Sequence, residues 1–296
     1  MELRHLRYFL AVAEARHFTR AAERLGIGQP PLSQQIRALE NELGTPLFRR
    51  LPRGVELTEA GNSFFDDARH IVAAADAAVE RAQRVARGDV GRLRIGMINS
   101  APFHPFVPRT IREFGRRYPE IHLSLEENST PVLAEAVLKE ESDIAFVRPL
   151  LGETAELVSE ALFDEDMLVA LPLGHALAHF QSLSLWALAG EAFVLFPRIV
   201  GAGLYDEIIS ACRRNGFSPK VAQETSQVTS IVNLVAAGLG VSLVPASMQQ
   251  IHSEGVTYRP IAGDAPRARM DLIHRRDDES AATANMIALA RELEKG

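Results

Sequence analysis

A run of polar side chains near the N-terminus has the hydrogen-bonding capacity to read DNA: Ser33, Gln34, Gln35 and Arg37. Hydroxyl, amide and guanidinium groups are the groups that pair with base edges in the major groove. Pro30 and Pro31 precede them and suit the first turn of a helix, where the helix dipole also attracts phosphate. The spacing therefore predicts a recognition helix, with a surface helix packed on another domain as the alternative.

Two helices joined by a tight turn would position this surface. Thr19 is a candidate N-cap for the first helix, and Gly26 suits the left-handed position that ends it. The second helix is expected to start at Pro30 and to end at Gly44, with a buried stripe of Leu32, Ile36, Leu39 and Leu43. A preceding helical stripe completes a small core of about 60 residues, formed by Leu3, Leu6, Leu10 and Ala13.

A β-hairpin is expected directly after the second helix. Leu47 and Phe48 indicate a short strand, residues 51–54 a turn, and residues 55–57 the returning strand. This hairpin would be the wing of a winged helix-turn-helix over residues 1–58, tipped by Arg49, Arg50 and Arg53, which are placed to contact phosphate or the minor groove. The residues expected to contact DNA are Thr19, Arg20, Gln29, Pro30, Pro31, Ser33, Gln34, Arg37, Arg50 and Arg53.

The distribution of charge favours a local nucleic-acid interface. The net charge of the chain is −6, yet residues 1–58 hold nine Arg against six Glu, a balance of +3 that leaves −9 for the remainder. Attraction to phosphate would therefore act at the N-terminal segment. Because +3 is a modest charge, two or more copies are expected to bind DNA together.

Composition excludes several classes of protein. The 296 residues are 47% apolar, which is typical of a globular chain of about two domains, and the single cysteine, Cys212, rules out an internal disulfide or a Cys-rich metal site. We find no signal peptide and no membrane-length apolar run, so a cytoplasmic protein is expected. Histidines such as His104 and His122 lack metal-ligand spacing, and no hydrolase elbow or Walker loop occurs. We expect no catalytic residues, no metal and no cofactor.

A long amphipathic helix is expected from Thr58 to about Arg87, with Thr58 as its cap. Its apolar positions recur every three or four residues and include many alanines, which let a second helix approach closely. About eight turns offer more surface than the small N-terminal domain covers. We assign residues 59–87 to a dimerisation helix and residues 88–92 to a hinge, with packing of the helix on its own domain as the alternative.

The remaining residues alternate between strand and helix patterns. Strands at 93–98, 122–126 and 143–147 with helices at 107–117 and 132–140 predict a βαβαβ unit and a parallel sheet. A second series has strands at 167–171, 193–196, 220–224 and 241–244 and helices near 183–188, 204–215 and 228–237. A strand at 268–274 and a helix at 281–294 would return to the first lobe. The expected effector domain, 93–296, has lobe I at about 93–162 and 267–296 and lobe II at about 163–266.

Polar residues follow two of these strands, Asn99-Ser100 and Ser129-Thr130, each ahead of a helix that a proline begins. Helix N-termini with hydroxyl groups form a site for a carboxylate or another small anion, and simple N-capping is the alternative for each residue. Arg148, after the third strand, would pair with an anionic ligand or with a carboxylate of the protein. Together with an opposite wall, the expected effector site comprises Asn99, Ser100, Thr130, Arg148, Phe196, Pro197, Gly203 and Leu204.

The order of head, long helix and two-lobed domain resembles the LysR-type transcriptional regulators over the whole chain. In the head the resemblance rests on MELRHLRYF, FTRAAERLGIGQPPLSQQIRALENELGTPLFRR and LTEAG. LVAAGLGVSLVPAS and residues 143–148 are most similar to the branch that regulates breakdown of benzoate, catechol, muconate and chlorinated aromatics. The chain departs from its relatives at Gln34, where Arg is common, and at Arg198-Ile199-Val200, where smaller residues are usual.

The resemblance implies an all-α winged helix-turn-helix head, a long linker helix and a two-lobed α/β effector domain of the periplasmic-binding-protein type (type 2). It implies a regulator that binds double-stranded promoter DNA and a small carboxylate inducer between its lobes, near Ser100, Thr130 and Arg148. It also implies contact with RNA polymerase, a homodimer paired through the linker helix and a homotetramer, away from the membrane. The competing function is a hydrolytic or ligand-binding α/β protein with an accessory DNA-binding head.

Overall fold

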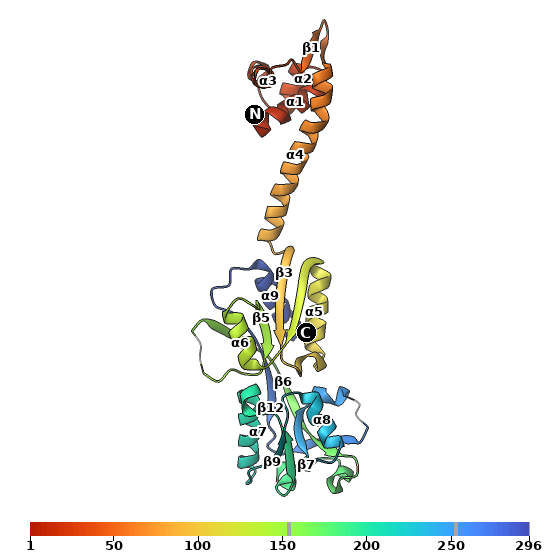
Figure 1. Cartoon of the computed structure of the whole chain (residues 1–296), viewed down its shortest axis with the longest axis vertical. Coiled ribbons are helices and arrows are strands. Elements are labelled where there is room, and N and C mark those ends of the chain that lie inside the picture. Colours follow the sequence, from red (N-terminus) through yellow and green to blue (C-terminus); the bar gives the residue numbers. More distant parts are fainter. Residues whose placement is uncertain (153–154, 252–253, 296) are drawn as a thin grey trace. The chain divides into compact units, whose positions relative to one another are not determined.

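The computed structural model describes residues 1–152, 155–251 and 254–295. The chain divides into two compact units, Met1–Arg84 and Val85–Gly296, and Figure 1 labels their elements. Among the described residues, the first unit is built on one hydrophobic core and the second on two.

Three helices and a hairpin form the head: α1 (Leu3–Ala15), α2 (Phe18–Leu25), α3 (Gln29–Leu43), β1 (Phe48–Leu51) and β2 (Gly54–Leu57). Gly26 and Gly44 end α2 and α3 with left-handed φ angles of 68° and 69°, which confirms both predicted helix ends. The predicted cap at Thr19 is wrong. The helix begins one residue earlier, at the half-buried Phe18, so His17 is the cap and its side chain accepts a hydrogen bond from the Thr19 amide.

The head core fixes the wing relative to the helices. The Phe9 ring of α1 lies 5.2 Å, centroid to centroid, from both Phe48 of the wing and Phe64 of the next helix. Glu40 of α3 ties the wing from the other side, because its Oε1 accepts hydrogen bonds from the amides of Leu47 at 2.8 Å and Phe48 at 3.1 Å. The predicted recognition helix and the wing are therefore parts of one rigid assembly.

The wing is longer than the sequence predicted. Strand β1 continues through Arg49 and Arg50, and the turn occupies Pro52 and Arg53. Arg49 is consequently not at the tip, since it pairs across the hairpin with Glu56 and donates to its carboxylate. An opposite-charge pair facing across two strands stabilises their pairing, which is the physical reason for the longer ladder.

Helix α4 (Glu59–Ala86) follows the wing. The Thr58 hydroxyl accepts a hydrogen bond from the Gly61 amide at 2.9 Å, which confirms the predicted cap. Gly61 is required there, because a Cβ would lie 2.1 Å from the carbonyl oxygen of Leu47. The next strand, β3 (Val90–Met97), begins earlier than predicted and takes residues 90–92 out of the expected hinge.

Lobe I contains the predicted βαβαβ series: β3, α5 (Phe106–Arg117), β4 (Glu120–Glu127), α6 (Thr130–Leu138) and β5 (Ile144–Val147). Strand β3 pairs in parallel with both β4 and β5, which confirms the parallel sheet. Helix α9 (Ala281–Glu294) returns to this lobe and packs against α5. The core of lobe I contains the fully buried side chains of Ile95, Phe114 and Phe146.

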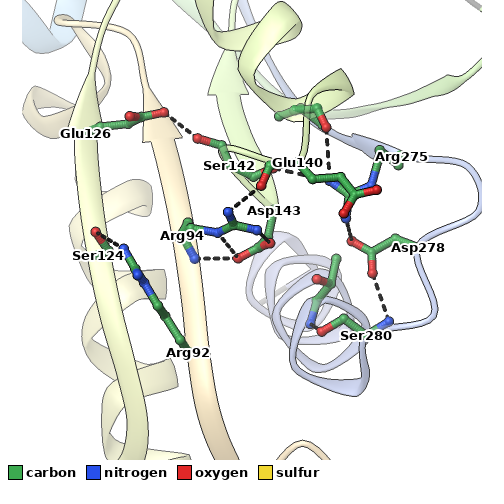
Figure 2. A network of polar contacts seen from close by, with 12 residues as sticks. Arg92, Arg94, Ser124, Glu126, Glu140, Ser142, Asp143, Arg275, Asp278 and Ser280 are labelled. Atoms are coloured by element: carbon green, nitrogen blue, oxygen red, sulfur yellow. Dashed lines mark hydrogen bonds and ion pairs between the residues drawn. The ribbon is translucent and has the colours of Figure 1, made fainter.

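A polar network anchors the loop that leads into β5, as Figure 2 shows. The Arg94 guanidinium donates to both carboxylate oxygens of Asp143, at 2.6 and 3.2 Å. Arg275, at the end of β12 (Arg267–Arg275), donates to the carbonyl oxygens of Val137 and Ser142 at 2.9 and 3.3 Å. These bonds fix the path of β5 toward the residue that follows it, Arg148.

Two long antiparallel strands run from lobe I into lobe II, β12 and β6 (Leu157–Pro172) (Figure 1). The sheet order is β4-β3-β5-β12-β6-β11-β7, with β10 also paired to β6. The predicted strand at 167–171 is only the last part of β6, because the earlier part alternates between buried and exposed residues and lacks a continuous apolar run. A β-bulge interrupts the register between Met270 and Asp271.

Lobe II surrounds a second core that includes Phe193, Ile208 and Val235. Strands β8 (Ala192–Leu195) and β9 (Lys220–Glu224) pair in parallel, whereas β10 (Ser242–Pro245) and β11 (Val256–Ala262) pair antiparallel with β6. Its α-helices are α7 (Ala202–Arg214) and α8 (Val228–Ala236), near the predicted positions.

Two predictions in lobe II differ from the structure. The helix expected near 183–188 is a two-residue strand, β7 (Leu183–Ser184), followed by the 3₁₀ helix η3 (Leu185–Leu188). Strand β11 was not expected, since its residues carry little apolar alternation. The remaining 3₁₀ helices are η1 (Ala101–Phe103), η2 (Ala176–His179), η4 (Arg198–Val200) and η5 (Ala246–Gln250).

Candidate DNA interface and effector cavity

The N-terminal half of α3 presents a polar, solvent-exposed surface. Gln29, Pro30, Pro31, Gln34 and Arg37 are exposed and Ser33 is half-buried, whereas Leu32, Ile36 and Leu39 face the core. Thr19 and Arg20 at the start of α2 are exposed as well. The structure therefore places the predicted contact residues of both helices at the surface.

Gln35 has a structural role. Its Oε1 lies 2.8 Å from Nε2 of His5 in α1, so this side chain joins the recognition helix to the first helix. The polar residues of the run thus divide into Gln35, which is bonded inside the head, and neighbours that are open to solvent.

Six arginines of the head have no carboxylate partner within the described ranges: Arg16, Arg20, Arg24, Arg37, Arg50 and Arg53. Arg50 and Gln29 line a crevice of about 210 Å³ between the helices and the wing, together with His17, Phe18 and Gly54. Unpaired guanidinium groups beside a helix N-terminus can bind phosphate oxygens. In this crevice Arg50 of the wing and Gln29 at the start of α3 line the same space.

Helix α4 packs Phe64 and Phe65 against the head core but leaves several later apolar side chains uncovered. Only Gly61 and Ala68 are buried among its described residues, while Ile71, Val79 and Val85 are 43%, 58% and 54% exposed. Apolar residues recurring on an uncovered helix mark a surface for a partner helix.

A small cavity of about 40 Å³ lies between lobe I and lobe II. Its polar lining comes from the ends of β3 and β4, the start of α6, the residue after β5 and the loop before α8, namely Asn99, Ser100, Asn128, Ser129, Thr130, Arg148 and Ser226. Its apolar lining is Ile98, Phe196, Val200, Leu204 and Val228, with Gly201 beside them. Six of the eight residues expected at the effector site line this cavity.

The other two expected residues lie elsewhere. Pro197 caps η4 and is not part of the lining. Gly203 sits in the first turn of α7 against lobe I, where a Cβ would come within 2.5 Å of the Pro149 carbonyl oxygen, and it faces a separate cavity. Both residues shape the loop around the cavity.

The expected pair of helix N-termini is partly corrected. Ser100 precedes η1, a 3₁₀ helix of three residues, because Pro102 is followed within a few residues by a second proline at the start of α5. Thr130, in contrast, opens α6, with Ser129 as its N-cap and Pro131 in the first turn. The cavity therefore meets the N-terminus of α6, whose first amides have no partner inside the helix.

Arg148 is fully buried and held by the protein. Its Nη1 donates to the carbonyl oxygens of Ala268 and Arg269 at 3.0 Å each, and its Nη2 lies 3.3 Å from both Ser100 Oγ and Glu165 Oε1. Burial lowers the pKa of the Arg148 guanidinium, and the nearby Glu165 carboxylate opposes that shift. Of the two partners foreseen for Arg148, the structure shows the carboxylate of the protein.

Glu165 is the main residue that the sequence did not reveal. It is 7% exposed, and its second oxygen accepts a hydrogen bond from the Ser247 amide at 3.0 Å. It lies within the run Asp164-Glu165-Asp166, which looks like a solvated acidic segment. A signal was available in the strand period, because alternate residues of β6 face the same side as the apolar residues that follow.

Several buried polar atoms around the cavity have no hydrogen-bond partner in the described part of the chain. They include Thr130 Oγ1 and Arg148 Nε, and Ser247 Oγ lies beside Glu165. Buried hydroxyl and guanidinium groups normally have partners, and leaving one unpaired costs about 1 to 3 kcal/mol. A ligand with acceptor oxygens in the cavity would satisfy the threonine.

The two lobes are held together across the cavity. Asn99 of lobe I donates from Nδ2 to the Ser226 carbonyl oxygen of lobe II at 3.0 Å. Nearby, His104 stacks on Phe163 with ring centroids 3.8 Å apart, and burial lowers the pKa of His104. The Asn99 hydrogen bond therefore links the two lobes directly at the cavity.

The described residues contain no cluster of His, Cys, Asp or Glu able to hold a metal ion. No described helix has both the length and the hydropathy needed to cross a membrane. Cys212 is buried in α7, which raises the pKa of its thiol to about 11.

Comparison with known proteins assigns both parts of the chain. Residues 3–62 match the model of the bacterial regulatory helix-turn-helix protein, lysR family, and residues 86–295 match the LysR substrate binding domain. The chain belongs to the LysR family of transcriptional regulators. Among its relatives, the HTH-type transcriptional regulator BudR of Raoultella terrigena is 45% identical over 95% of this chain and 97% of BudR.

Solved LysR-type structures share the fold. Full-length CbnR in complex with its target DNA aligns with a TM-score of 0.84 and 30% identity over 99% of this chain and 100% of CbnR. Full-length BenM aligns with a TM-score of 0.63 and 32% identity over 100% of this chain and 97% of BenM. These matches confirm the predicted fold class and the predicted placement in the benzoate and chlorocatechol branch.

As a LysR-type regulator, this protein binds promoter DNA and a small-molecule inducer and forms oligomers. It is not an enzyme, in agreement with the lack of a catalytic constellation in its sequence. In such a regulator, the exposed face of α3 is the candidate DNA-binding surface and the interlobe cavity is the candidate inducer site.

Proposed function

We propose that this LysR-type protein regulates transcription in response to a small carboxylate bound in the interlobe cavity. The observation that carries the proposal is the buried, unpartnered Thr130 hydroxyl at the N-terminus of α6, inside a cavity that both lobes enclose. Hydroxyl groups and free helix amides can both donate hydrogen bonds to an anion, and the positive end of the helix dipole favours its charge. Because the chain is similar to CbnR and BenM, aromatic acids are among the inducers to test.

The proposed DNA contacts follow from exposure and charge. Gln29, Ser33, Gln34 and Arg37 on α3 are assigned to the major groove, with Pro30 and Pro31 shaping the start of the helix. Arg50 and Arg53 on the wing and Thr19 and Arg20 on α2 are assigned to the phosphate backbone. Gln34 is assigned to a base edge, since an amide pairs best with adenine.

The proposed assembly uses the uncovered side of α4 for pairing. Two α4 helices from two protomers would cover Ile71, Val79 and Val85, and two such dimers form a tetramer on an extended promoter site. The regulator works in the cytoplasm and acts on RNA polymerase at that promoter. Inducer binding changes promoter occupancy or bending only as far as the inducer prefers one arrangement of the tetramer, a coupling of about 1 to 3 kcal/mol.

The proposal is tested by gel shift of the full-length protein with the intergenic DNA that lies beside its gene. The wild type is expected to bind one fragment selectively, and a carboxylate that stabilises the protein is expected to change the mobility or the affinity of that complex. Thr130→Ala is expected to bind the same fragment and to lose the response to the acid. An acid response that survives in both Thr130→Ala and Ser100→Ala would place the inducer outside this cavity.

A further inference from the structure

We infer that lobe I carries a second binding site, an open pocket that takes a phosphate monoester with an apolar substituent. The pocket measures about 480 Å³ and is lined by residues that follow β5, begin β6, and lie along or just after β12. None of the described residues that line it also lines the interlobe cavity, so this inference does not depend on the proposed carboxylate site. Three features carry it: a fixed arginine, a second arginine with unused donors, and an apolar wall.

The first feature is the Arg269 guanidinium, which the protein holds in one orientation. Its Nε lies 2.6 Å from Asp271 Oδ1, and its Nη2 lies 3.1 Å from Asp271 Oδ2. The Asp271 carboxylate is 2% exposed and also accepts a hydrogen bond from Ser159 Oγ at 2.8 Å. Within the described part of the chain, Nη1 of Arg269 makes no hydrogen bond, so it is available to a ligand. A donor that is fixed before binding loses little entropy when a ligand arrives.

The second feature is Arg276, whose side chain lines the same pocket. Its Nε donates to the Ala155 carbonyl oxygen at 2.7 Å, while Nη1 and Nη2 have no partner among the described residues. The two terminal nitrogens of one guanidinium can bind two oxygens of a phosphate group. Nη1 of Arg269 adds a donor for the third oxygen, whereas a carboxylate has only two oxygens to offer.

The charge of the pocket also suits a phosphate group. Two arginines and one aspartate among its described lining give a balance of +1, although residues 59–296 together carry −9. The pocket is therefore a local positive site in an acidic part of the chain. A phosphate monoester carries about −1.5 to −2 at pH 7. Because the pocket is open, water solvates the charge that the arginines do not balance.

The third feature is an apolar wall beside the arginines, formed by Pro149, Leu150, Leu157 and Val158. Inorganic phosphate would leave this wall in contact with water. A phosphate monoester with an aromatic or aliphatic group would cover it, and removing apolar surface from water is favourable. The wall therefore selects an ester over the free ion.

The inference is tested by calorimetric titration of the full chain with phenyl phosphate at constant ionic strength. Inorganic phosphate supplies the anion without the ring, and phenol supplies the ring without the anion. We expect saturable binding of phenyl phosphate, at least tenfold weaker binding of inorganic phosphate, and no binding of phenol. Equal affinity for phenyl phosphate and inorganic phosphate would overturn the selection of an ester, and equal affinity for phenol would overturn the requirement for an anion.

Arg276→Gln is the variant that tests the site itself. It removes one charge and the two unused donors, and it is expected to weaken binding of phenyl phosphate at least tenfold. Arg276→Lys keeps the charge without the planar fork and should restore the affinity only in part. The matched control is Arg109→Gln, which removes an exposed arginine of α5 in the same lobe, outside the pocket lining, and should leave the affinity unchanged.

Two further variants distinguish this pocket from other sites that attract anions. Thr130→Ala alters the interlobe cavity and Arg50→Ala alters the head, and both are expected to bind phenyl phosphate like the wild type. Loss of binding in Thr130→Ala would place the probe in the interlobe cavity, and loss in Arg50→Ala would place it on the head. Either result, or the same affinity in Arg276→Gln as in the wild type, would overturn the inference and leave the proposed carboxylate response standing.

Discussion

Arg148, directly after β5, and Glu165 of β6 form a buried ion pair whose side chains are 3% and 7% exposed. Each buried charge is compensated by the opposite charge of its partner and by backbone groups. Two carbonyl oxygens accept hydrogen bonds from Arg148, and the Ser247 amide donates one to Glu165. Removing one member is therefore much more harmful than removing an exposed pair.

Glu165→Ala is expected to destabilise the effector domain by about 3 to 5 kcal/mol, because it leaves the Arg148 guanidinium buried without a counter-charge. Glu165→Gln, which keeps an acceptor for Arg148, should lose less. Urea denaturation followed by circular dichroism measures the change. Asp264→Ala is the control, since it removes one of the two carboxylate partners of the exposed Arg214 and should hardly move the midpoint. A Glu165→Ala midpoint equal to that of the control would mean that water replaces the carboxylate.

His104 makes the stability of lobe I depend on pH. Burial lowers its pKa, Glu165 opposes that shift and Arg148 adds to it, so the folded state favours the neutral imidazole. A proton is then bound more readily by the unfolded chain, and stability is lost as pH falls from about 6.5, the usual histidine pKa, toward the lower folded value.

We expect a lower melting temperature at pH 5.5 than at pH 7.5 and a smaller difference in His104→Phe. Phenylalanine keeps the ring stacked on Phe163 but cannot be protonated. Comparison of the two proteins at both pH values isolates the histidine from the many carboxylates that titrate lower. An identical pH dependence in the variant would assign the loss to other groups.

At the scale of elements, the start of α7 decides how closely the lobes approach. Gly203 lies so near lobe I that a Cβ would come within 2.5 Å of the Pro149 carbonyl oxygen, which is backbone and cannot yield easily. The same helix supplies Leu204 to the cavity. Closure of the lobes and formation of the cavity wall therefore depend on one residue without a side chain.

Gly203→Ala is expected to hold the lobes apart and to weaken inducer binding at least tenfold, while DNA binding by the head is retained. Calorimetric titration with a carboxylate that stabilises the wild type measures the affinity. Gly174→Ala is the matched control, because nothing lies within 4 Å of a Cβ built there. Normal affinity in Gly203→Ala would show that lobe I moves to accommodate the methyl group at little cost.

Helix α4 carries a prediction about assembly. Replacing both Ile71 and Val79 by Asp places charges on its uncovered apolar surface and should shift the protein toward monomers in analytical ultracentrifugation. Gln83→Glu, also exposed on α4, adds a charge at a polar position and should leave the oligomer intact. An unchanged sedimentation coefficient in the double variant would mean that oligomers form through other surfaces.

The helices of this protein could be predicted more accurately than its strands. Caps and stops such as Thr58, Gly26 and Gly44 act locally and are visible in the sequence. The wing strand through Arg49 depends on a cross-strand partner, and the first half of β6 depends on β12, more than 90 residues away. Pairing of distant strands leaves little local signal, which is also why Glu165 was missed.

At the scale of the whole molecule, the acidic chain carries its positive charge in the head. A regulator with several heads on one promoter should therefore show a steep salt dependence, since each phosphate contact adds about −0.9 to the slope of log affinity against log salt. Contacts to bases, in contrast, add selectivity without changing that slope.

Arg50→Ala is expected to reduce the magnitude of the salt slope by about one for each head that contacts DNA, and to weaken all sequences alike. Gln34→Ala should keep the slope and lose about 1 to 3 kcal/mol of discrimination between the correct base and a wrong one. Fluorescence anisotropy at four salt concentrations, with specific and scrambled duplexes, separates the two effects. The same slope for wild type and Arg50→Ala would show that Arg50 makes no phosphate contact.

The strand pair β6 and β12 has a mechanical consequence. A ribbon of two hydrogen-bonded strands resists stretching but twists readily, so the lobes that it joins can turn against each other more easily than they can separate. The ladder between the two strands is interrupted by the bulge between Met270 and Asp271. The Arg148 guanidinium donates to the backbone just ahead of this bulge, at Ala268 and Arg269. A ligand that forms a hydrogen bond with Ser100 is therefore linked through Arg148 to the strand pair that joins the two lobes, next to its bulge.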